Sequence, residues 1–574
     1  MPPRPRRLAL LAVFCSVAVF AGSLRPAAQS ARRVPRHTRH RLKPLVHGAT
    51  GGVRSSAAGD DTDPPEVAVG ERLFLETRFA QFFAAHVGSD VNRRLATGDP
   101  VLDTLETASG LLRGPFAGKS VNCRSCHFVD DATAMGARVN TYGDYTTRSR
   151  VPEREDGETR TPRNSPPLVN ATLPRTGFVL HFDGEFPSAE SLVRGTLLGR
   201  NFGWMPTETA TARAHIARVV REDDGTDELA RQYAGLPYWV LLQGTDPRIP
   251  SDLRLPEAYR ADALRSDDDA VLDVVARLVA AYLHSLVFAQ GEDGCFDGSP
   301  YDAFLAKNGL PCAPDAGEPA SAYAKRLKAA VDGLAAPLYV GPGDGSFELQ
   351  DQPFKFGRDE LQGLRVFLTG GDEARSSAGN CVACHTPPVF TDFSFHNTGA
   401  TQEEYDALHG TGAFASLPLP DLATRNAQPD AYLPPSAAHP AALGIFRRPA
   451  ARERPGQTDL GLWNVWANPS IPAPQAAIAE ALGVSGRSAA EVLPRTAAAF
   501  KTPALRGLGQ SAPYFHTGRM ASVEQAVQFY ALFSQKARLG RVFNAAPEIQ
   551  GIFLSTADVA PLVAFLEALD EDYQ

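Results

Sequence analysis

The sequence predicts a mainly α-helical protein with two domains of the same kind, irregular insertions and little β structure. The five-residue pattern Cys-x-x-Cys-His occurs twice, at residues 123–127 and 381–385. Apolar residues recur at helical spacing in several stretches, whereas the alternating pattern of strands is weak throughout. The chain has 574 residues, 43% of them hydrophobic, and this is enough for two or three domains with their own cores.

The N-terminus is typical of a secretory signal peptide, residues 1–21. Three arginines within the first seven residues precede an apolar run over residues 8–20, and Ala21 ends a suitable cleavage site. The alternative is a membrane anchor, but the apolar run is short for a span. Cys15 follows a phenylalanine, which does not suit lipid attachment. Residues 22–65 are rich in Arg, Ala, Gly and Pro without periodicity, which predicts a disordered linker.

The first domain is expected over residues 66–340. Apolar positions from Val69 to Phe83 predict one amphipathic helix at its start. Residues 128–165 are polar and predict a loop. A long helix near residues 271–286 is predicted by apolar residues at helical spacing, namely Val271, Val274, Val275, Leu278, Tyr282, Leu283 and Leu286.

The second domain is expected over residues 346–574, after a Gly/Pro-rich boundary at residues 337–345. A helix is predicted over residues 358–368, and the Pro- and Ala-rich residues 400–495 predict an insertion. Ser522 and Gln525 resemble a capping box that begins a further helix. The last helix is expected from about Ala557.

The repeated pattern is the attachment signature of c-type haem. Each cysteine forms a thioether with a haem vinyl group, and the histidine binds the iron as proximal ligand. The anchors are therefore Cys123, Cys126, Cys381 and Cys384, with His127 and His385 as ligands. A redox-active dithiol leaves the histidines unexplained. A shared zinc site is the other alternative, but more than 250 residues separate the two cysteine pairs.

An exported protein also explains the two remaining cysteines. Cys295 and Cys312 are expected to form a disulfide in an oxidising compartment, the alternative being two free thiols. No later segment has the pattern of a membrane span. Residues 1–55 carry eleven of the 57 basic residues and no acidic one, so the remainder has 46 basic against 65 acidic residues, a balance of −19. This balance argues against nucleic-acid binding and suits a basic electron carrier as partner.

The sixth iron ligand decides whether a haem relays electrons or binds peroxide or oxygen. No histidine lies between Phe128 and Leu180, so the first iron is expected to be open or water-bound, with Met135 as the rival ligand. For the second iron the candidates are His516, Met520 and Tyr530. Methionine is the common partner in c-type haem, whereas helical phase places Tyr530 on the face of Val523 and Val527.

Two further stretches resemble a known family. The residues Phe500-Lys-Thr-Pro-Ala-Leu-Arg-Gly followed by Ala512-Pro-Tyr-Phe-His-Thr-Gly resemble the C-terminal signature of bacterial di-haem cytochrome c peroxidases and MauG-like enzymes. The residues Arg163-Asn-Ser-Pro-Pro-Leu-Val-Asn and His181-Phe-Asp-Gly resemble the segment between their haems. The resemblance covers roughly residues 66–574 and implies two cytochrome c-like domains with an inter-haem interface.

The resemblance implies a peroxide site at the N-terminal haem and electron transfer through the C-terminal haem. A calcium ion usually lies between them, and its ligands match Asn164 by side chain and Ser511 and Pro513 by position. The distal ligand of the second haem falls at Tyr530, where peroxidases carry methionine and MauG-like proteins carry tyrosine. Tyr530 is therefore preferred over Met520.

The chain departs from the family at catalytic positions. Phe182 replaces the tryptophan between the haems, and Phe202 stands where the distal-pocket glutamate falls. Glu208 and Trp204 are the candidates to compensate, and His181 is either a pocket acid/base or a structural histidine.

We therefore expect a periplasmic di-haem oxidoreductase that reduces hydrogen peroxide with electrons from a small c-type cytochrome or a cupredoxin. The cofactors are two covalently bound haem c groups and a calcium ion. Two alternatives stay open, a non-catalytic electron carrier with both irons saturated and an oxygenase of the same fold.

Overall fold

The computed structural model describes residues 63–107, 110–114, 116–127, 131–132, 138–139, 148–291, 293–347, 352–374, 376–508 and 511–571, all within one compact unit. The prediction of a mainly α protein is confirmed. The described strands are short and form three antiparallel pairs, β1 (Thr104–Thr107) with β2 (Gly110–Arg113), β3 (Asp131–Ala132) with β4 (Arg138–Val139), and β5 (Phe395–His396) with β6 (Phe500–Lys501).

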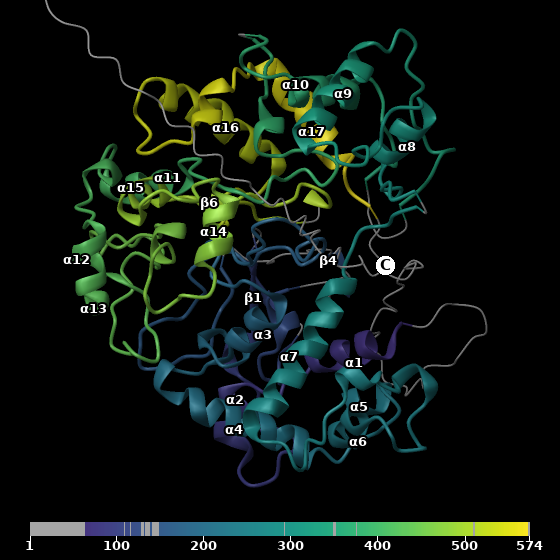
Figure 1. Cartoon of the computed structure of the whole chain (residues 1–574), viewed down its shortest axis with the longest axis vertical. Coiled ribbons are helices and arrows are strands. Elements are labelled where there is room, and N and C mark those ends of the chain that lie inside the picture. The colour runs from purple at the N-terminus through teal and green to yellow at the C-terminus, as the bar shows by residue number, and fades with distance from the viewer. Residues whose placement is uncertain are drawn as a thin grey trace, which may run out of the picture. The chain divides into compact units, whose positions relative to one another are not determined.

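The first buried cluster surrounds α7 (Asp268–Ser285), the long helix predicted from its apolar spacing. Asp267 caps this helix, since its carboxylate accepts the backbone N–H of Ala270. Figure 1 shows α7 beside α1 and α3. The other helices of this part are α1 (Pro65–Phe74), α2 (Gln81–Val87), α3 (Ala189–Leu197), α4 (Thr209–Glu222), α5 (Glu228–Gln232) and α6 (Tyr238–Gln243).

The single helix expected from Val69 to Phe83 is wrong, because the chain forms α1 and α2 with a turn between them. The carboxylate of Glu76 accepts the backbone N–H of Arg78 at 2.9 Å, and this local bond competes with helix continuation. The first described helix, α1, begins at Pro65, and the start of the folded part stays a prediction.

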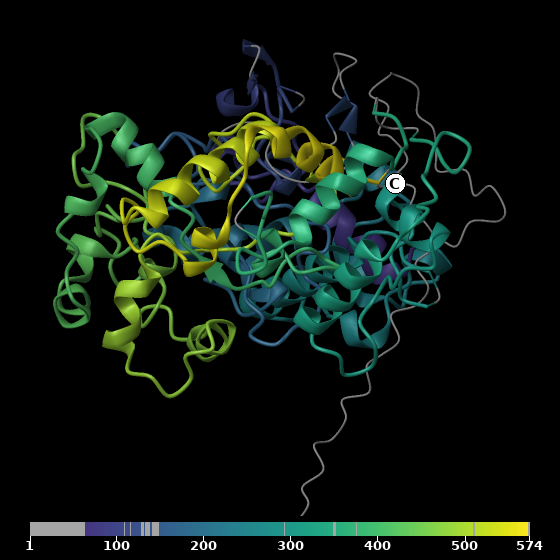
Figure 2. The same cartoon turned by 90° about the horizontal axis from the view of Figure 1, so that it is seen from above.

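The second buried cluster is built by α8 (Pro300–Lys307), α9 (Ala320–Asp332), α10 (Arg358–Leu368), α16 (Val523–Arg538) and α17 (Thr556–Glu567). Both views in Figures 1 and 2 show α10 against α17 and α16 near them. At Gly363 a Cβ atom would lie 2.0 Å from the carbonyl oxygen of Pro561, so only glycine permits this approach of α10 to α17. The predicted bounds of α10 and the start of the last helix are confirmed to within one residue.

The capping box predicted for α16 forms only in part. The hydroxyl of Ser522 accepts the backbone N–H of Gln525, as expected. The side chain of Gln525 accepts the N–H of Ala521 instead of that of Ser522.

A third buried cluster, around Trp463, which is 1% exposed, is built mostly by residues 400–495 and is joined by Val179 and Phe395. The helices here are α11 (Ala400–His409), α12 (Leu422–Ala427), α13 (Pro429–Tyr432), α14 (Gln475–Ala481) and α15 (Ala489–Thr496). The interpretation of this region as an insertion, and the boundary at residues 337–345, stay predictions.

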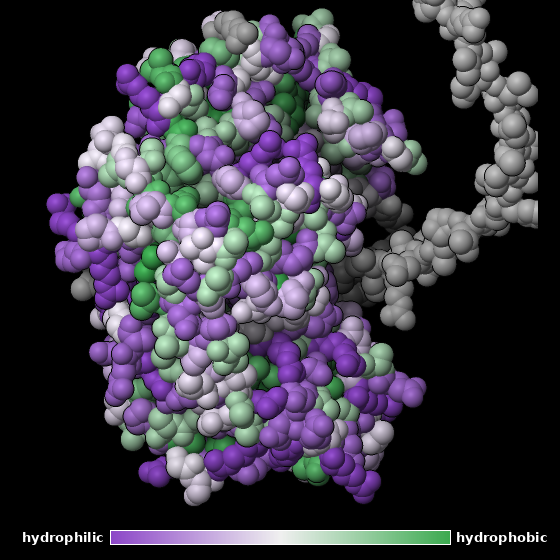
Figure 3. Space-filling model, turned by 60° about the vertical axis from the view of Figure 1, so that its left-hand side comes forward, coloured by the Kyte–Doolittle hydropathy of each residue, from purple (hydrophilic) through white to green (hydrophobic). Residues whose placement is uncertain are grey.

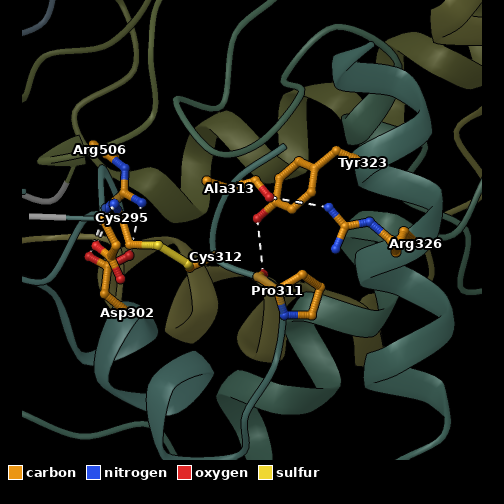
Figure 4. The surroundings of a disulfide bond; sticks show 9 residues. Cys295, Asp302, Pro311, Cys312, Ala313, Tyr323, Arg326 and Arg506 are labelled. Atoms are coloured by element: carbon orange, nitrogen blue, oxygen red, sulfur yellow. Dashed lines mark hydrogen bonds and ion pairs between the residues drawn. A yellow bond between two sulfur atoms is a disulfide. The ribbon is translucent and has the colours of Figure 1, made fainter. Parts of the chain in front are cut away.

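The predicted disulfide between Cys295 and Cys312 is present, with the two Cα atoms 5.5 Å apart. Figure 4 shows beside it the ion pair of Arg506 and Asp302, in which both guanidinium–carboxylate distances are 2.9 Å.

The surface view of Figure 3 mixes polar and apolar residues. In the part of the chain that the structure describes, no helix is both long enough and apolar enough to cross a membrane. The predicted signal peptide and the linker up to residue 62 lie outside the described residues.

Candidate haem sites and the segment between them

The first motif begins in a short 3-10 turn, Cys123–Ser125, that Asn122 caps through its side chain. The backbone N–H of His127 donates to the carbonyl of Cys123 at 3.0 Å, so one turn of chain carries both cysteines and the histidine. Burial raises the pKa of Cys123 to about 12. Burial also lowers the pKa of His127 to about 4, with a smaller contribution from a charge on His181. A neutral imidazole is the form that binds iron.

The second motif repeats this arrangement at Cys381–Ala383, where the N–H of His385 donates to the carbonyl of Cys381 at 2.8 Å. The Nδ1 atom of His385 lies 3.0 Å from the carbonyl of Phe390. Since a carbonyl only accepts, Nδ1 carries the proton and Nε2 is the nitrogen left to bind a metal. Burial raises the pKa of Cys381 to about 12 and lowers that of His385.

These pKa shifts argue against the redox-dithiol alternative, because a reactive dithiol needs a cysteine with a lowered pKa. The zinc alternative also finds no support, since no cluster among the described residues brings together cysteines of both motifs. Cys123 packs against the first apolar cluster, whereas Cys381 packs against the second. The thiols, the neutral imidazoles and the apolar surroundings fit two covalently held haems.

A cavity of about 40 Å³ lies between the two histidine loops, with room for about one water molecule. Its wall includes Pro166 and Pro503. The backbone of Pro166 contacts His127 and the backbone of Pro503 contacts His385, and each contact works to raise the pKa of its histidine against the larger effect of burial. Phe182 is 9% exposed and lines the same cavity. The segments that contact His127 and His385 thus meet at one cavity, and Phe182 lines it.

Lys501 lines this cavity as well, and sequence reasoning gave it no role. Its backbone N–H donates to the carbonyl of Phe182 at 2.7 Å, and its ammonium group lies 3.4 Å from the carbonyl of Val179. Burial lowers the pKa of Lys501 to about 7, and the positive charge of Arg175 adds to the shift.

His181 lies on the His127 side of this segment, close enough for its charge to lower the pKa of His127. Its Nδ1 atom lies 3.5 Å from the carboxylate of Glu185. The suggested role of His181 as a pocket acid/base stays a prediction, and its ring also meets the ring of Phe186 edge-on, with centroids 4.8 Å apart.

The residues considered for the distal pocket of the first haem have other partners. Phe202 and Trp204 are both 2% exposed in the first apolar cluster, and the indole of Trp204 donates to the carbonyl of Phe79 at 3.1 Å. Glu208 pairs with Arg154 at 2.7 Å, and this contact lowers the pKa of Glu208. Met135, the rival ligand, lies outside the described residues.

Among the candidates for the second distal ligand, Tyr530 is near the second motif. Burial raises the pKa of Tyr530, and nearby charges at Cys384 and Cys381 raise it further. Met520 packs against the second apolar cluster and against the one that Tyr530 borders. His516 stacks on Phe500 with ring centroids 3.5 Å apart.

The Nε2 atom of His516 lies 3.1 Å from the hydroxyl of Thr401, so this nitrogen already has a hydrogen-bond partner. Burial lowers the pKa of His516 well below its ordinary value.

The residues expected to hold calcium partly converge. The side-chain nitrogen of Asn164 lies 2.6 Å from the carbonyl of Pro513 and 3.4 Å from that of Phe515. Its side-chain oxygen is buried and has no hydrogen-bond partner among the described residues. A calcium site formed by the Asn164 oxygen and these carbonyls requires the amide to be turned over, so the site stays a prediction. The hydroxyl of Ser511 donates to the carbonyl of Gly507.

Two haem-attachment motifs on a mainly helical fold support the interpretation as a di-haem c-type protein. No family model matches the chain. The chain is 26% identical over 246 residues to the cytochrome-c peroxidase IdrP2 of Denitromonas iodatirespirans, a stretch that covers 38% of this chain and 51% of that protein. It thus spans about half the length of this curated relative.

Two solved structures are also similar. The diheme peroxidase BthA from Burkholderia thailandensis E264 matches with a TM-score of 0.43 and 18% identity, over 91% of this chain and 90% of that one. A MauG-like protein associated with microbial copper homeostasis matches with a TM-score of 0.40 and 15% identity, over 89% and 91%. The curated match supports the resemblance to cytochrome c peroxidases that the motifs predict.

Proposed function

We propose that this protein reduces hydrogen peroxide at its N-terminal haem with electrons that enter through its C-terminal haem. The observation that carries the proposal is the cavity between the two histidine loops, with Phe182 in its wall. Segments that contact His127 and His385 border this one cavity, and two haems held by these loops would be near enough for electron transfer. The curated match to a cytochrome-c peroxidase supports the reaction class.

In this function His127 and His385 would hold the two irons, and the four motif cysteines would anchor the haems. Bound haem supplies a redox-active iron for cleavage of the peroxide O–O bond. The carbonyl of Phe390 orients the ring of His385, and Phe182 fills space between the sites. Reduction of one peroxide takes two electrons and two protons and yields two water molecules.

We further propose a periplasmic location, a calcium ion at Asn164 and Pro513, and Tyr530 as distal ligand of the second iron. The disulfide and the attachment motifs support export. The acidic balance of the mature chain supports a basic donor, a small c-type cytochrome or a cupredoxin.

One observation favours the second candidate function, electron transfer without peroxide chemistry. Glu208 forms an ion pair with Arg154, and the indole N–H of Trp204 donates to the carbonyl of Phe79. Neither side chain is therefore free to give a proton to the peroxide O–O bond. If both irons are saturated, the protein carries electrons only.

Electron paramagnetic resonance of the oxidised holoprotein, combined with peroxide turnover, separates the two functions. One high-spin and one low-spin ferric signal, with peroxide-dependent oxidation of a reduced small cytochrome, is the expected result. Two low-spin signals and no turnover, before and after partial reduction, would establish the carrier instead. If the pyridine haemochrome assay finds fewer than two haems in the purified protein, both proposed functions are refuted.

A further inference from the structure

The residues between the haems form a tight turn, which we call the inter-haem turn, residues 180–186. Its ends pair through the N–H of Leu180 and the carbonyl of Phe186 at 2.8 Å. His181 and Gly184 both have a left-handed backbone, with φ of 66° and 73°. The turn presents Phe182 to the cavity, so the geometry of the turn sets the position of that ring.

Two arginines hold the acidic side chains of the inter-haem turn. Asp183 is fully buried, and its carboxylate lies 2.6 Å from Arg163 and 3.1 Å from Arg447. Arg447 also pairs with Glu185 through both of its terminal nitrogens. Burial alone would raise the pKa of Asp183, but the two arginines hold it below its ordinary value.

Arg447 belongs to residues 400–495, the region without an assigned role. A second residue of that region, Asp459, is 1% exposed at its side chain and binds Arg163 at 2.5 and 2.9 Å. The region therefore reaches the inter-haem turn twice, directly through Arg447 and indirectly through Asp459 and Arg163.

The same region contacts the neighbouring segments at two further buried points. The carboxylate of Glu404 lies 2.9 Å from Arg148, and the hydroxyl of Thr401 meets His516. Three of the four contacts fall on the inter-haem turn, on Arg163 beside Asn164, and on His516, whose carbonyl accepts the backbone N–H of Asn164. Residues 400–495 thus pack against the segments around the cavity and the proposed calcium site.

We propose that Arg447 is a positioning residue that fixes the inter-haem turn, and through it Phe182, for electron transfer between the haems. This inference rests on the proposed two-haem function. Removal of Arg447 would leave Asp183 with one arginine and Glu185 with none, and buried carboxylates that lose a partner rearrange. An arginine suits the role because its fork reaches two carboxylates at once.

The neighbouring residue provides a matched control. Arg448 also comes from the same loop and forms one ion pair, with Glu158 at 2.5 Å, but it does not touch the inter-haem turn. The variants are Arg447→Gln, Arg447→Lys and Arg448→Gln, each purified as the full-length holoprotein. The first readout is hydrogen exchange of the backbone amides of Leu180 and Lys501, which report the turn itself and need no haem.

In Arg447→Gln we expect exchange at both amides to accelerate about tenfold or more. Inter-haem electron transfer after rapid reduction should slow several-fold in Arg447→Gln, because Phe182 is no longer held in place at the cavity. The midpoint potential of the N-terminal haem should fall in Arg447→Gln, because loss of a positive charge stabilises ferric iron. Arg447→Lys should keep the potential and recover only part of the rate, and Arg448→Gln should match the wild type.

Wild-type exchange and wild-type electron transfer in Arg447→Gln would overturn the proposal, as would equal effects in Arg448→Gln. If Arg447→Gln does not fold, Glu185→Gln tests the same contact with Arg447 left paired to Asp183, and the same changes are expected in smaller size. A wild-type protein without two haems would instead refute the proposed function, and the exchange result would still decide whether Arg447 fixes the turn.

Discussion

Replacement of Arg506 by methionine is expected to destabilise the protein and to loosen the loop that carries His385. The guanidinium of Arg506 and the carboxylate of Asp302 are 1% and 3% exposed at their side chains and form two parallel bonds of 2.9 Å. The Nε atom of Arg506 also donates to the carbonyl of Pro388 at 2.9 Å, three residues after His385.

The expected loss follows from the burial of this pair. Opposite charges about 4 Å apart attract by about 4 kcal/mol at an effective dielectric constant near 20. Removal of one partner leaves Asp302 buried without a counter-charge, which typically costs about 3–5 kcal/mol. For a domain of this kind such a loss lowers the melting temperature by roughly 10 °C.

The assay is thermal unfolding of the holoprotein followed by far-ultraviolet circular dichroism, with visible spectra of the second haem. Arg326→Met is the matched control, because Arg326 is 36% exposed at its side chain and pairs with Glu318 (Figure 4 shows both arginines). Loss of such a surface pair should cost about 1 kcal/mol or less. The double variant Arg506→Met with Asp302→Asn should recover part of the stability. Equal shifts in Arg506→Met and Arg326→Met would refute the reasoning.

Three further outcomes are expected. Tyr530→Phe should change the ferric spectrum of the second haem while Met520→Leu leaves it as in the wild type, and the reverse would make Met520 the ligand. Asn164→Ala should release the calcium measured by mass spectrometry in the wild type, and an unchanged metal content would contradict the site at Asn164. Lys501→Met should stabilise the protein by roughly 2–4 kcal/mol at pH 7, because the folded-state pKa of about 7 lies below the unfolded value of about 10.5. The unfolded chain then binds the extra proton, so the gain should shrink as the pH rises from 7 towards 10.5, and a gain independent of pH would contradict this cause.

Local patterns in the sequence were sufficient for the long helices and for the haem motifs. The apolar spacing of α7 and α10 is set by residues within a few turns of one another, and the predicted positions are confirmed. The break after α1 was missed because a side-chain bond from Glu76 stops the helix, and apolar spacing contains no sign of such a bond.

The candidate site was predictable from the sequence only where a short stretch of neighbouring residues identifies it. The motif residues and Phe182 were named from the sequence, and the structure places Phe182 at the cavity between the histidine loops. Arg447 was missed because its partner Glu185 lies 262 residues away, and a charge within a Pro- and Ala-rich stretch does not show what it pairs with. Lys501 was quoted within a motif, but its burial came only from the fold.

The long sequence separations of these contacts also determine when they are able to form. Arg163 and Asp459 are 296 residues apart, and Arg148 and Glu404 are 256 apart. Closing a loop of about 300 residues costs roughly 5 kcal/mol of chain entropy before any contact repays it. We therefore expect the inter-haem turn to reach its final conformation late in folding, after the buried cluster around Trp463 has formed. Until these distant contacts form, Phe182 is not held at the cavity, so we expect rapid electron transfer between the two haems to appear only at the end of folding.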